Sequence, residues 1–121
     1  MCKRGDIYYA DLGSDFSSSI QNGTRPVLVV SNNLANTHSP VVTIIPLTAR
    51  VQKKGSLPTH VSIPRWSGSG LPRSSVALAE QVRTIAKDQL QEYKGHISSG
   101  QVMAAVTKAL QVQIGAIDTP H

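Results

Sequence analysis

The sequence has a single cysteine and no long hydrophobic run. Cys2 cannot form a disulfide within the chain, and one thiol beside the chain start lacks partners for a metal site or for nucleophilic chemistry, so we expect it in a frayed end. No apolar stretch reaches the roughly 18 residues that a membrane-spanning helix needs, and the first residues lead into a predicted strand instead of the apolar segment of a signal peptide. We therefore expect a cytoplasmic protein without membrane association.

Acidic residues are missing from the middle of the chain. No Asp or Glu occurs between residues 16 and 79, whereas six basic residues do: Arg25, Arg50, Lys53, Lys54, Arg65 and Arg73. A catalytic carboxylate pair or a metal cage of oxygen ligands would have to come from the few acids outside this region. Together with a formal net charge of +5, this distribution favours a polyanionic partner.

Histidine and aromatic residues are few. His38, His60, His96 and His121 show no ligand spacing such as i and i+4, so we expect no zinc site and no other cofactor. A ribonuclease that uses two histidines stays an alternative, because histidine is the usual acid–base residue near neutral pH. One Phe, one Trp and three Tyr leave little capacity for stacking on nucleobases.

Most of the chain has the alternation and the β-branched runs of short strands. Strands are expected at residues 6–12, 27–30, 41–48 and 59–64, with one or two more within residues 74–85. Pro46 lacks an amide donor, so the strand that contains it should bulge or reach an edge there.

Helical character is weaker and lies mainly near the C-terminus. Residues 31–40 predict a turn with one helical turn, and residues 86–95 predict a brief helix. Ser98 or Ser99 would cap a longer helix that runs to Gly115.

These elements predict one domain over residues 1–121 with a mainly β fold. Five or more short strands before a C-terminal helix suit a small, strongly bent sheet or partly open barrel that the helix covers. The connection at residues 13–23 is too long for a simple hairpin, and ordered loops of this length are more often functional than decorative.

Four blocks in series carry a resemblance to a known family. They are KRGDIYYADL (3–12), NGTRPVLVVSNN (22–33), SPVVTIIPLTARVQKKGSLPTHVSI (39–63) and SSVALAEQVRTIAKDQL (74–90). From residue 3 to Asp118 the chain resembles the MazF/PemK-type toxin endoribonucleases of type II toxin–antitoxin systems. The resemblance implies a small SH3-like, partly open β-barrel of the MazF/CcdB type and sequence-specific cleavage of single-stranded mRNA, which inhibits translation and growth.

The resemblance also implies that Arg25 and Thr48 are the catalytic pair. In RNA the neighbouring 2′-hydroxyl attacks the phosphodiester, so no metal-bound water is needed, and the products are a 2′,3′-cyclic phosphate and a 5′-hydroxyl. A guanidinium fork holds two phosphate oxygens, and a threonine hydroxyl adds another hydrogen bond. Because arginine is a poor general base at neutral pH, we assign Arg25 to charge stabilisation and to proton donation toward the leaving 5′-oxygen, and the general base stays open.

Residues in the first long loop and in the matching blocks are candidates for RNA binding. They offer one stacking ring, amide edges and cations that suit phosphates: Phe16, Gln21, Asn22, Asn32, Arg50, Lys53, Lys54 and Gln81. Lys53 and Lys54 have the alternative of a solvated loop. The RNA sequence that is cleaved does not carry over from the family, because residues 13–23 and 65–73 are the least family-like segments.

The family is homodimeric and is neutralised by antitoxins with acidic tails. The resemblance therefore implies a homodimer and an acidic antitoxin partner, for which the acid-free middle of the chain is a plausible receptor. Two other functions stay open: a gyrase poison of the CcdB type, which has the same barrel but cleaves nothing, and a non-catalytic RNA-binding barrel.

Overall fold

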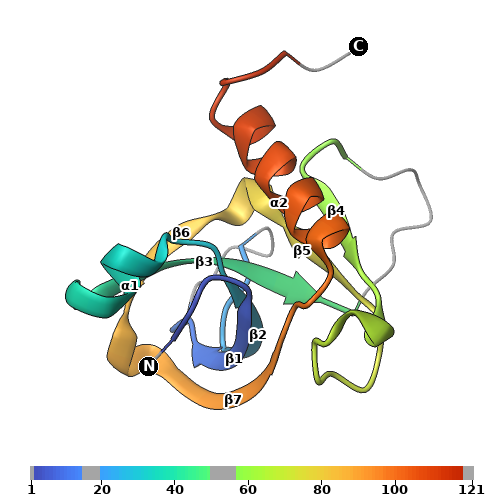
Figure 1. The fold of residues 1–121 in the computed structure, drawn as a ribbon. Coiled ribbons are helices and arrows are strands. Elements are labelled where there is room, and N and C mark those ends of the chain that lie inside the picture. The colour runs from blue at the N-terminus through green and yellow to red at the C-terminus, as the bar shows by residue number, and fades with distance from the viewer. Residues whose placement is uncertain (1, 15–19, 50–56, 119–121) are drawn as a thin grey trace.

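The computed structural model describes residues 2–14, 20–49 and 57–118, and Figure 1 shows how their elements are arranged. The strands are β1 (Asp6–Asp11), β2 (Thr24–Val29), β3 (Val41–Thr48), β4 (His60–Ile63), β5 (Ser75–Leu78), β6 (Arg83–Ala86) and β7 (Leu90–His96). The α-helices are α1 (Asn33–His38) and α2 (Gly100–Gln113), and single 3₁₀ turns form η1 (Arg65–Ser67), η2 (Ala79–Gln81) and η3 (Lys87–Gln89).

The strands form one bent, antiparallel sheet in the order β4-β5-β3-β2-β1-β7, with β6 pairing on β3. Figure 1 shows β1, β2, β3 and β7 curving round one side of the molecule, with β4, β5 and α2 on the other. Within the described strands β7 pairs with β1 and has no pairing with β6, so the barrel is not closed. The predicted fold class, a mainly β, partly open barrel with a C-terminal helix, is confirmed.

Two apolar clusters lie on opposite faces of this sheet because side chains alternate along a strand. On β2, Leu28 belongs to a first cluster under α2, whereas Val27 and Val29 belong to a second cluster enclosed by the curved strands. Helix α2 covers the first cluster with Val102, Val106 and Ala109 and packs against β4 and η2. The side chain of Ser99 caps it by accepting a hydrogen bond from Val102 N at 3.2 Å, as the sequence predicts.

Pro46 lies where β3 changes partners. One edge of β3 pairs with β6 up to Ile44 and with β5 from Leu47 onward. Val30 N donates to Thr43 O at 3.0 Å, so by alternation the nitrogen of residue 46 faces the edge away from β2, between β6 and β5. The missing donor of Pro46 therefore interrupts no ladder.

The brief helix predicted at residues 86–95 is wrong. Only η3 is helical there, and β7 follows it and pairs with β1. The Tyr8 and Tyr93 rings meet across this pair edge to face, with centroids 5.4 Å apart. Strand pairing and the aromatic contact outweigh the weak local helical pattern, because strand stability comes mostly from neighbours distant in sequence.

The frayed end predicted for Cys2 is also wrong. Cys2 is 7% exposed and packs in the second cluster. Backbone hydrogen bonds from Gly5 N to Val29 O (2.8 Å) and from Asp6 N to Lys3 O (2.9 Å) hold the first residues against the sheet. No helix in the described part of the chain is long and apolar enough to cross a membrane.

Gly70 gives a test of how closely the segment between η1 and β5 packs on β7. Its φ is +71°, and an added Cβ would lie 1.8 Å from the carbonyl oxygen of Lys94. We expect Gly70→Ala to lower the free energy of unfolding by at least about 2 kcal/mol in urea titrations, because both the clash and the backbone conformation oppose it. Gly115→Ala is the matched control, since its φ is +75° but an added Cβ meets no neighbour within 4 Å. Equal losses in the two variants would contradict the close packing.

Candidate active site

Arg25 lies on β2 next to the end of the long connection between β1 and β2. Its Nε donates to the carbonyl oxygen of Asn22 at 3.0 Å, which anchors the inner end of the guanidinium and leaves both terminal nitrogens for other acceptors. The residue is partly buried, and no acidic residue in the described ranges forms an ion pair with it. A partly desolvated guanidinium of this kind suits an anionic ligand.

The register of β2 and β3, continued beyond its last pair, aligns Arg25 with Thr48. The two strands pair antiparallel through Val29–Ile44, Leu28–Ile45 and Val27–Pro46. Extended by two residues, the same register places Arg25 across from Thr48, and both residues belong to these strands. Residues that face each other in an antiparallel pair project their side chains to the same side of the sheet.

The apolar clusters identify that side. Val27 and Val29 on β2 and Ile44 on β3 lie in the second cluster, and alternation carries the same face on to Arg25 and Thr48. Ala10, the partner of Arg25 on β1, is fully buried in the same cluster. Arg25 and Thr48 thus lie on the same side of the sheet as the second cluster, directly beyond its last apolar residues on these two strands.

Pro26 explains why the β2–β3 ladder stops at Val27–Pro46. Since Val30 N bonds to Thr43 O, alternation directs the nitrogen of residue 26 toward the carbonyl of Leu47. Proline has no hydrogen to donate there, so one of the two hydrogen bonds between residues 26 and 47 is lost. Arg25 and Thr48 are the next residues beyond this weakened position.

A contact between distant segments brings two other predicted site residues together. Gln81, at the end of η2, accepts a hydrogen bond from the backbone N of Gln21 at 2.8 Å through its side-chain oxygen. Gln21 precedes Asn22, the residue that anchors Arg25. The side-chain oxygen of Gln21 is itself buried and has no hydrogen-bond partner within the described ranges, although a buried acceptor without a donor costs about 1–3 kcal/mol.

Asn32 lies apart from this group. Its side-chain oxygen caps α1 by accepting from Ala35 N at 2.8 Å, although the residue is exposed. Helix capping uses the side-chain oxygen of Asn32 and leaves its side-chain amide nitrogen for a ligand. Four more predicted RNA-binding residues lie outside the described residues: Phe16, Arg50, Lys53 and Lys54.

Glu80 is the polar residue near the site that the sequence did not single out. Its two carboxylate oxygens lie 2.8 Å from Thr59 Oγ1 and 2.9 Å from His60 Nε2. Its position in the sequence could have pointed to it, since Glu80 is the first acidic residue after the acid-free stretch and directly precedes Gln81.

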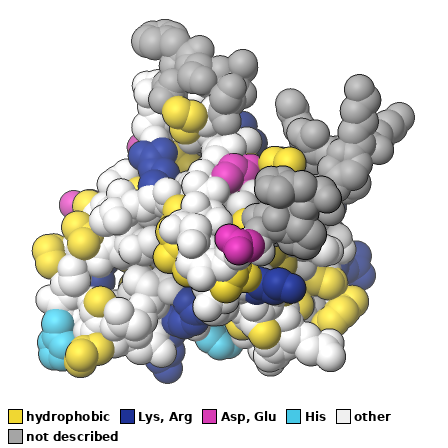
Figure 2. Space-filling model, turned by 90° about the horizontal axis from the view of Figure 1, so that it is seen from above, with side chains coloured by type: hydrophobic (Ala, Val, Ile, Leu, Met, Phe, Trp, Pro, Cys, Tyr) yellow, Lys and Arg dark blue, Asp and Glu magenta, His cyan; other side chains and the backbone are white. Residues whose placement is uncertain are grey.

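The net charge agrees with a polyanionic ligand, since it is +5. Figure 2 shows Lys and Arg side chains scattered over the face seen from above, with Asp and Glu side chains among them.

The sequence matches the model of a known toxin family. The model of the PemK-like, MazF-like toxin of type II toxin–antitoxin systems matches residues 3–114. The chain belongs to this family. The resemblance noted in the four sequence blocks is thereby confirmed.

Individual relatives of this toxin family agree in sequence and in fold. The chain is 44% identical over 116 residues to the endoribonuclease EndoA of Bacillus subtilis, covering 96% of this chain and 97% of that protein. It is 39% identical over 115 residues to the endoribonuclease MazF of Staphylococcus saprophyticus, covering 95% and 92%. A mycobacterial endoribonuclease solved in complex with its cognate antitoxin superposes with a TM-score of 0.76 at 29% identity, covering 99% of this chain and all of that one.

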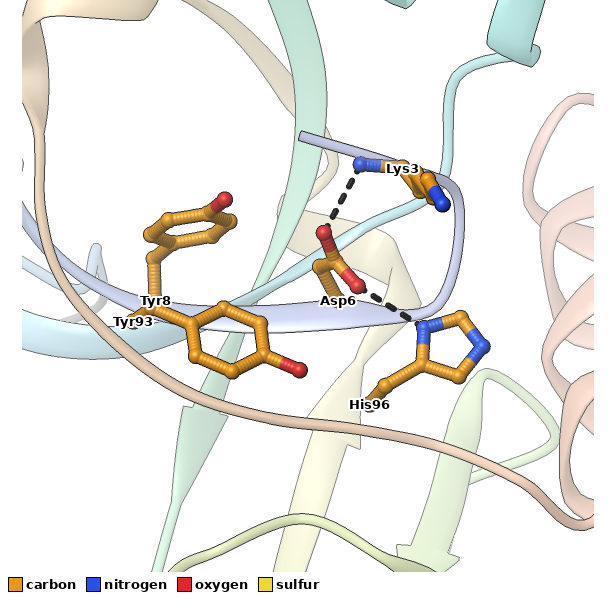
Figure 3. Close-up of a pocket in the computed structure, with 5 residues that line it drawn as sticks. All are labelled: Lys3, Asp6, Tyr8, Tyr93 and His96. Carbon is orange, nitrogen blue, oxygen red and sulfur yellow. Dashed lines mark hydrogen bonds and ion pairs between the residues drawn. The ribbon is translucent and has the colours of Figure 1, made fainter. Parts of the chain in front are cut away.

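Away from Arg25 and Thr48, this member of the family has a polar pocket of about 360 Å³ where β1 pairs with β7. Figure 3 shows the carboxylate of Asp6 between the backbone N of Lys3 and the ring of His96, both 2.8 Å away, with the rings of Tyr8 and Tyr93 beside them. Asp6 is only 5% exposed, and these two donors satisfy both of its oxygens.

The histidines do not pair with one another in the described part of the chain. His60 contacts Glu80 and His96 contacts Asp6, in separate pockets. His121 lies outside the described residues. The alternative of a two-histidine ribonuclease therefore has no support from these positions. No cluster of three or more His, Cys, Asp or Glu side chains that could hold a metal ion occurs among the described residues.

Tyr8 yields a pH prediction. Burial raises the pKa of its phenol above the ordinary value near 10, and the charge of Asp6 raises it further. The unfolded chain then loses this proton first as the pH rises, so the Tyr8 contribution to stability should fall from about pH 10 upward and reach its lowest level above the folded-state pKa. We expect spectrophotometric titration of Tyr8→Phe to lack a high-pH transition that the unmodified protein shows. Loss of a transition at or below the ordinary pKa would contradict the burial of Tyr8.

Proposed function

We propose that this toxin is a sequence-specific endoribonuclease that cleaves single-stranded mRNA without a metal ion and so inhibits translation and growth. The observation that carries the proposal is the register of β2 and β3, whose continuation two residues beyond Val27–Pro46 aligns Arg25 with Thr48 on the side of the second cluster. The identity of 44% to a protein named as an endoribonuclease, over nearly the whole chain, supports the same activity.

The chemistry needs little from the protein beyond alignment and charge. The 2′-oxygen forms a bond to phosphorus while the bond to the 5′-oxygen breaks, which gives a 2′,3′-cyclic phosphate and a 5′-hydroxyl. Arg25 and Thr48 hold the non-bridging oxygens as negative charge grows on them, and we assign proton donation toward the leaving 5′-oxygen to Arg25. The proton of the 2′-hydroxyl leaves to a base other than Arg25, because a guanidinium stays protonated at neutral pH.

RNA binding is assigned to the loop beside the pair and to η2. Asn22, Gln21 and Gln81 are adjacent to one another and to Arg25. The buried side-chain oxygen of Gln21 has no donor among the described residues, and an exocyclic amine of a nucleobase is a donor of the type that would satisfy it. Asn32, Phe16, Arg50, Lys53 and Lys54 stay predicted RNA contacts.

The partners follow from the family and from the charge. We infer a single-domain toxin in the cytoplasm that acts as a homodimer and is neutralised by an acidic antitoxin. The solved mycobacterial relative is an endoribonuclease bound to its cognate antitoxin. Residues 16–79 carry basic but no acidic side chains, which suits an acidic tail that becomes ordered on binding.

Loss of the guanidinium tests the catalytic assignment. We expect Arg25→Ala to lower kcat on a defined single-stranded RNA in EDTA by at least about 100-fold, because one donor aimed at developing charge is typically worth that much. Arg65→Ala, which removes an exposed arginine on η1, is the matched control and should cleave normally. Intact RNA with the unmodified protein, together with trapped gyrase–DNA complexes, would favour the CcdB-type alternative and contradict the proposal.

Salt dependence tests the antitoxin partner. Because attraction between an acidic tail and a basic surface is screened, the dissociation constant of the toxin–antitoxin complex should rise steeply with ionic strength. Titration calorimetry at low and high salt measures the effect. The control is the unmodified toxin titrated with an antitoxin tail in which the acidic residues are replaced by their amides. An affinity that is unchanged by salt would contradict a charge-based receptor.

A further inference from the structure

Glu80 ties η2 to the start of β4. Its Oε1 accepts from Thr59 Oγ1 at 2.8 Å, and its Oε2 lies 2.9 Å from His60 Nε2. The backbone adds a third contact, since Ala79 N donates to Thr59 O at 2.9 Å. Thr59 is 8% exposed, and the side chain of His60 is 11% exposed. Both partners of the carboxylate are therefore held in packed surroundings, and they fix the turn that contains it.

The turn is connected to the catalytic arginine through two further hydrogen bonds. Gln81 follows Glu80 and accepts from Gln21 N at 2.8 Å. Asn22 follows Gln21 and accepts from Arg25 Nε at 3.0 Å. A continuous path thus runs from the carboxylate to the guanidinium, made of alternating covalent neighbours and hydrogen bonds.

The connection between β1 and β2 needs such an anchor. At its base it is closed by two backbone hydrogen bonds, Leu12 N to Gly23 O (2.9 Å) and Gly23 N to Gly13 O (2.7 Å). The contact of Gln21 with Gln81 joins it to a segment 60 residues away in the chain. A long arginine side chain keeps one position only where its acceptor is held, because it otherwise loses much rotamer freedom on ordering.

We propose that Glu80 is a positioning residue for RNA cleavage, which holds η2 on β4 so that Gln81, Gln21 and Asn22 keep the guanidinium of Arg25 aimed at the scissile phosphate. The inference rests on the proposed endoribonuclease function and adds a residue that acts through others. Glu80 itself need not contact the RNA.

Substitutions at Glu80 separate hydrogen bonding from charge. Glu80→Ala removes both side-chain contacts and should lower kcat by about 10- to 100-fold, with a smaller change in KM, because a small misplacement of a catalytic group affects the chemical step most. Glu80→Gln keeps the shape, an oxygen for Thr59 and a polar group beside the His60 ring, so it should retain most of the activity. Thr59→Val removes one of the two contacts, so its kcat should lie between those of Glu80→Ala and Glu80→Gln.

Glu92→Ala is the matched control. Glu92 is on β7, has a side chain that is 68% exposed and lies 3.5 Å from Lys94. Its loss changes the net charge by the same amount and should leave kcat unchanged. Melting temperatures and circular dichroism of every variant establish that the folded protein is being assayed.

Nuclear magnetic resonance tests the path without relying on catalysis. In Glu80→Ala, the Arg25 Nε–H and the Gln21 amide should exchange with solvent faster than in the unmodified protein and in Glu92→Ala, because their acceptors are no longer fixed. Unchanged exchange, or a kcat within twofold of the unmodified protein, overturns the positioning role. Equal losses in Glu80→Ala and Glu80→Gln overturn it too, since charge would then matter and not the contacts. Absence of cleavage by the unmodified protein counts against the proposed function alone, and the exchange measurement still decides the role of Glu80.

Discussion

The antiparallel register between β2 and β3 is the constraint on which the site depends. It is fixed by buried apolar residues on both faces of the two strands, so a shift by one residue would turn every side chain to the wrong face. Continued two residues past its last pair, the same register aligns Arg25 with Thr48, and Pro26 lies directly before Arg25 in β2. Core packing therefore determines which residues the two strands carry at this end of the sheet.

The second constraint is the anchoring of the long connection that enters β2. Arg25 is held through Asn22, and the neighbouring Gln21 is held through Gln81 on a turn that β4 supports. Strand β2 determines the side of the sheet on which the Arg25 side chain lies, and the loop holds its Nε through the carbonyl of Asn22. A site built in this way combines a rigid sheet with a segment that a ligand or a partner is able to reorder.

Much of the fold could be predicted from the sequence, because local patterns determine it. The β-branched runs at residues 27–30 and 41–48 and the capped helix after Ser99 are found as strands and a helix. The prediction of a helix at residues 86–95 failed because the strand there is stabilised by pairing with β1, and no local sequence pattern shows that pairing. Arg25 and Thr48 were predicted through family resemblance, since an arginine at a strand entrance has no distinctive periodicity. Glu80 was missed because its importance depends on partners about 20 residues away.

A structure of the protein bound to an RNA oligonucleotide with a 2′-deoxy nucleotide at the cleavage position, which blocks attack, tests the central claim most directly. The account predicts that one phosphate lies within hydrogen-bond distance, about 3 Å, of both the Arg25 guanidinium and the Thr48 hydroxyl, with the neighbouring 2′-position in line with its 5′-oxygen. A phosphate that contacts only one of the two side chains, or an RNA strand bound elsewhere on the molecule, would contradict it.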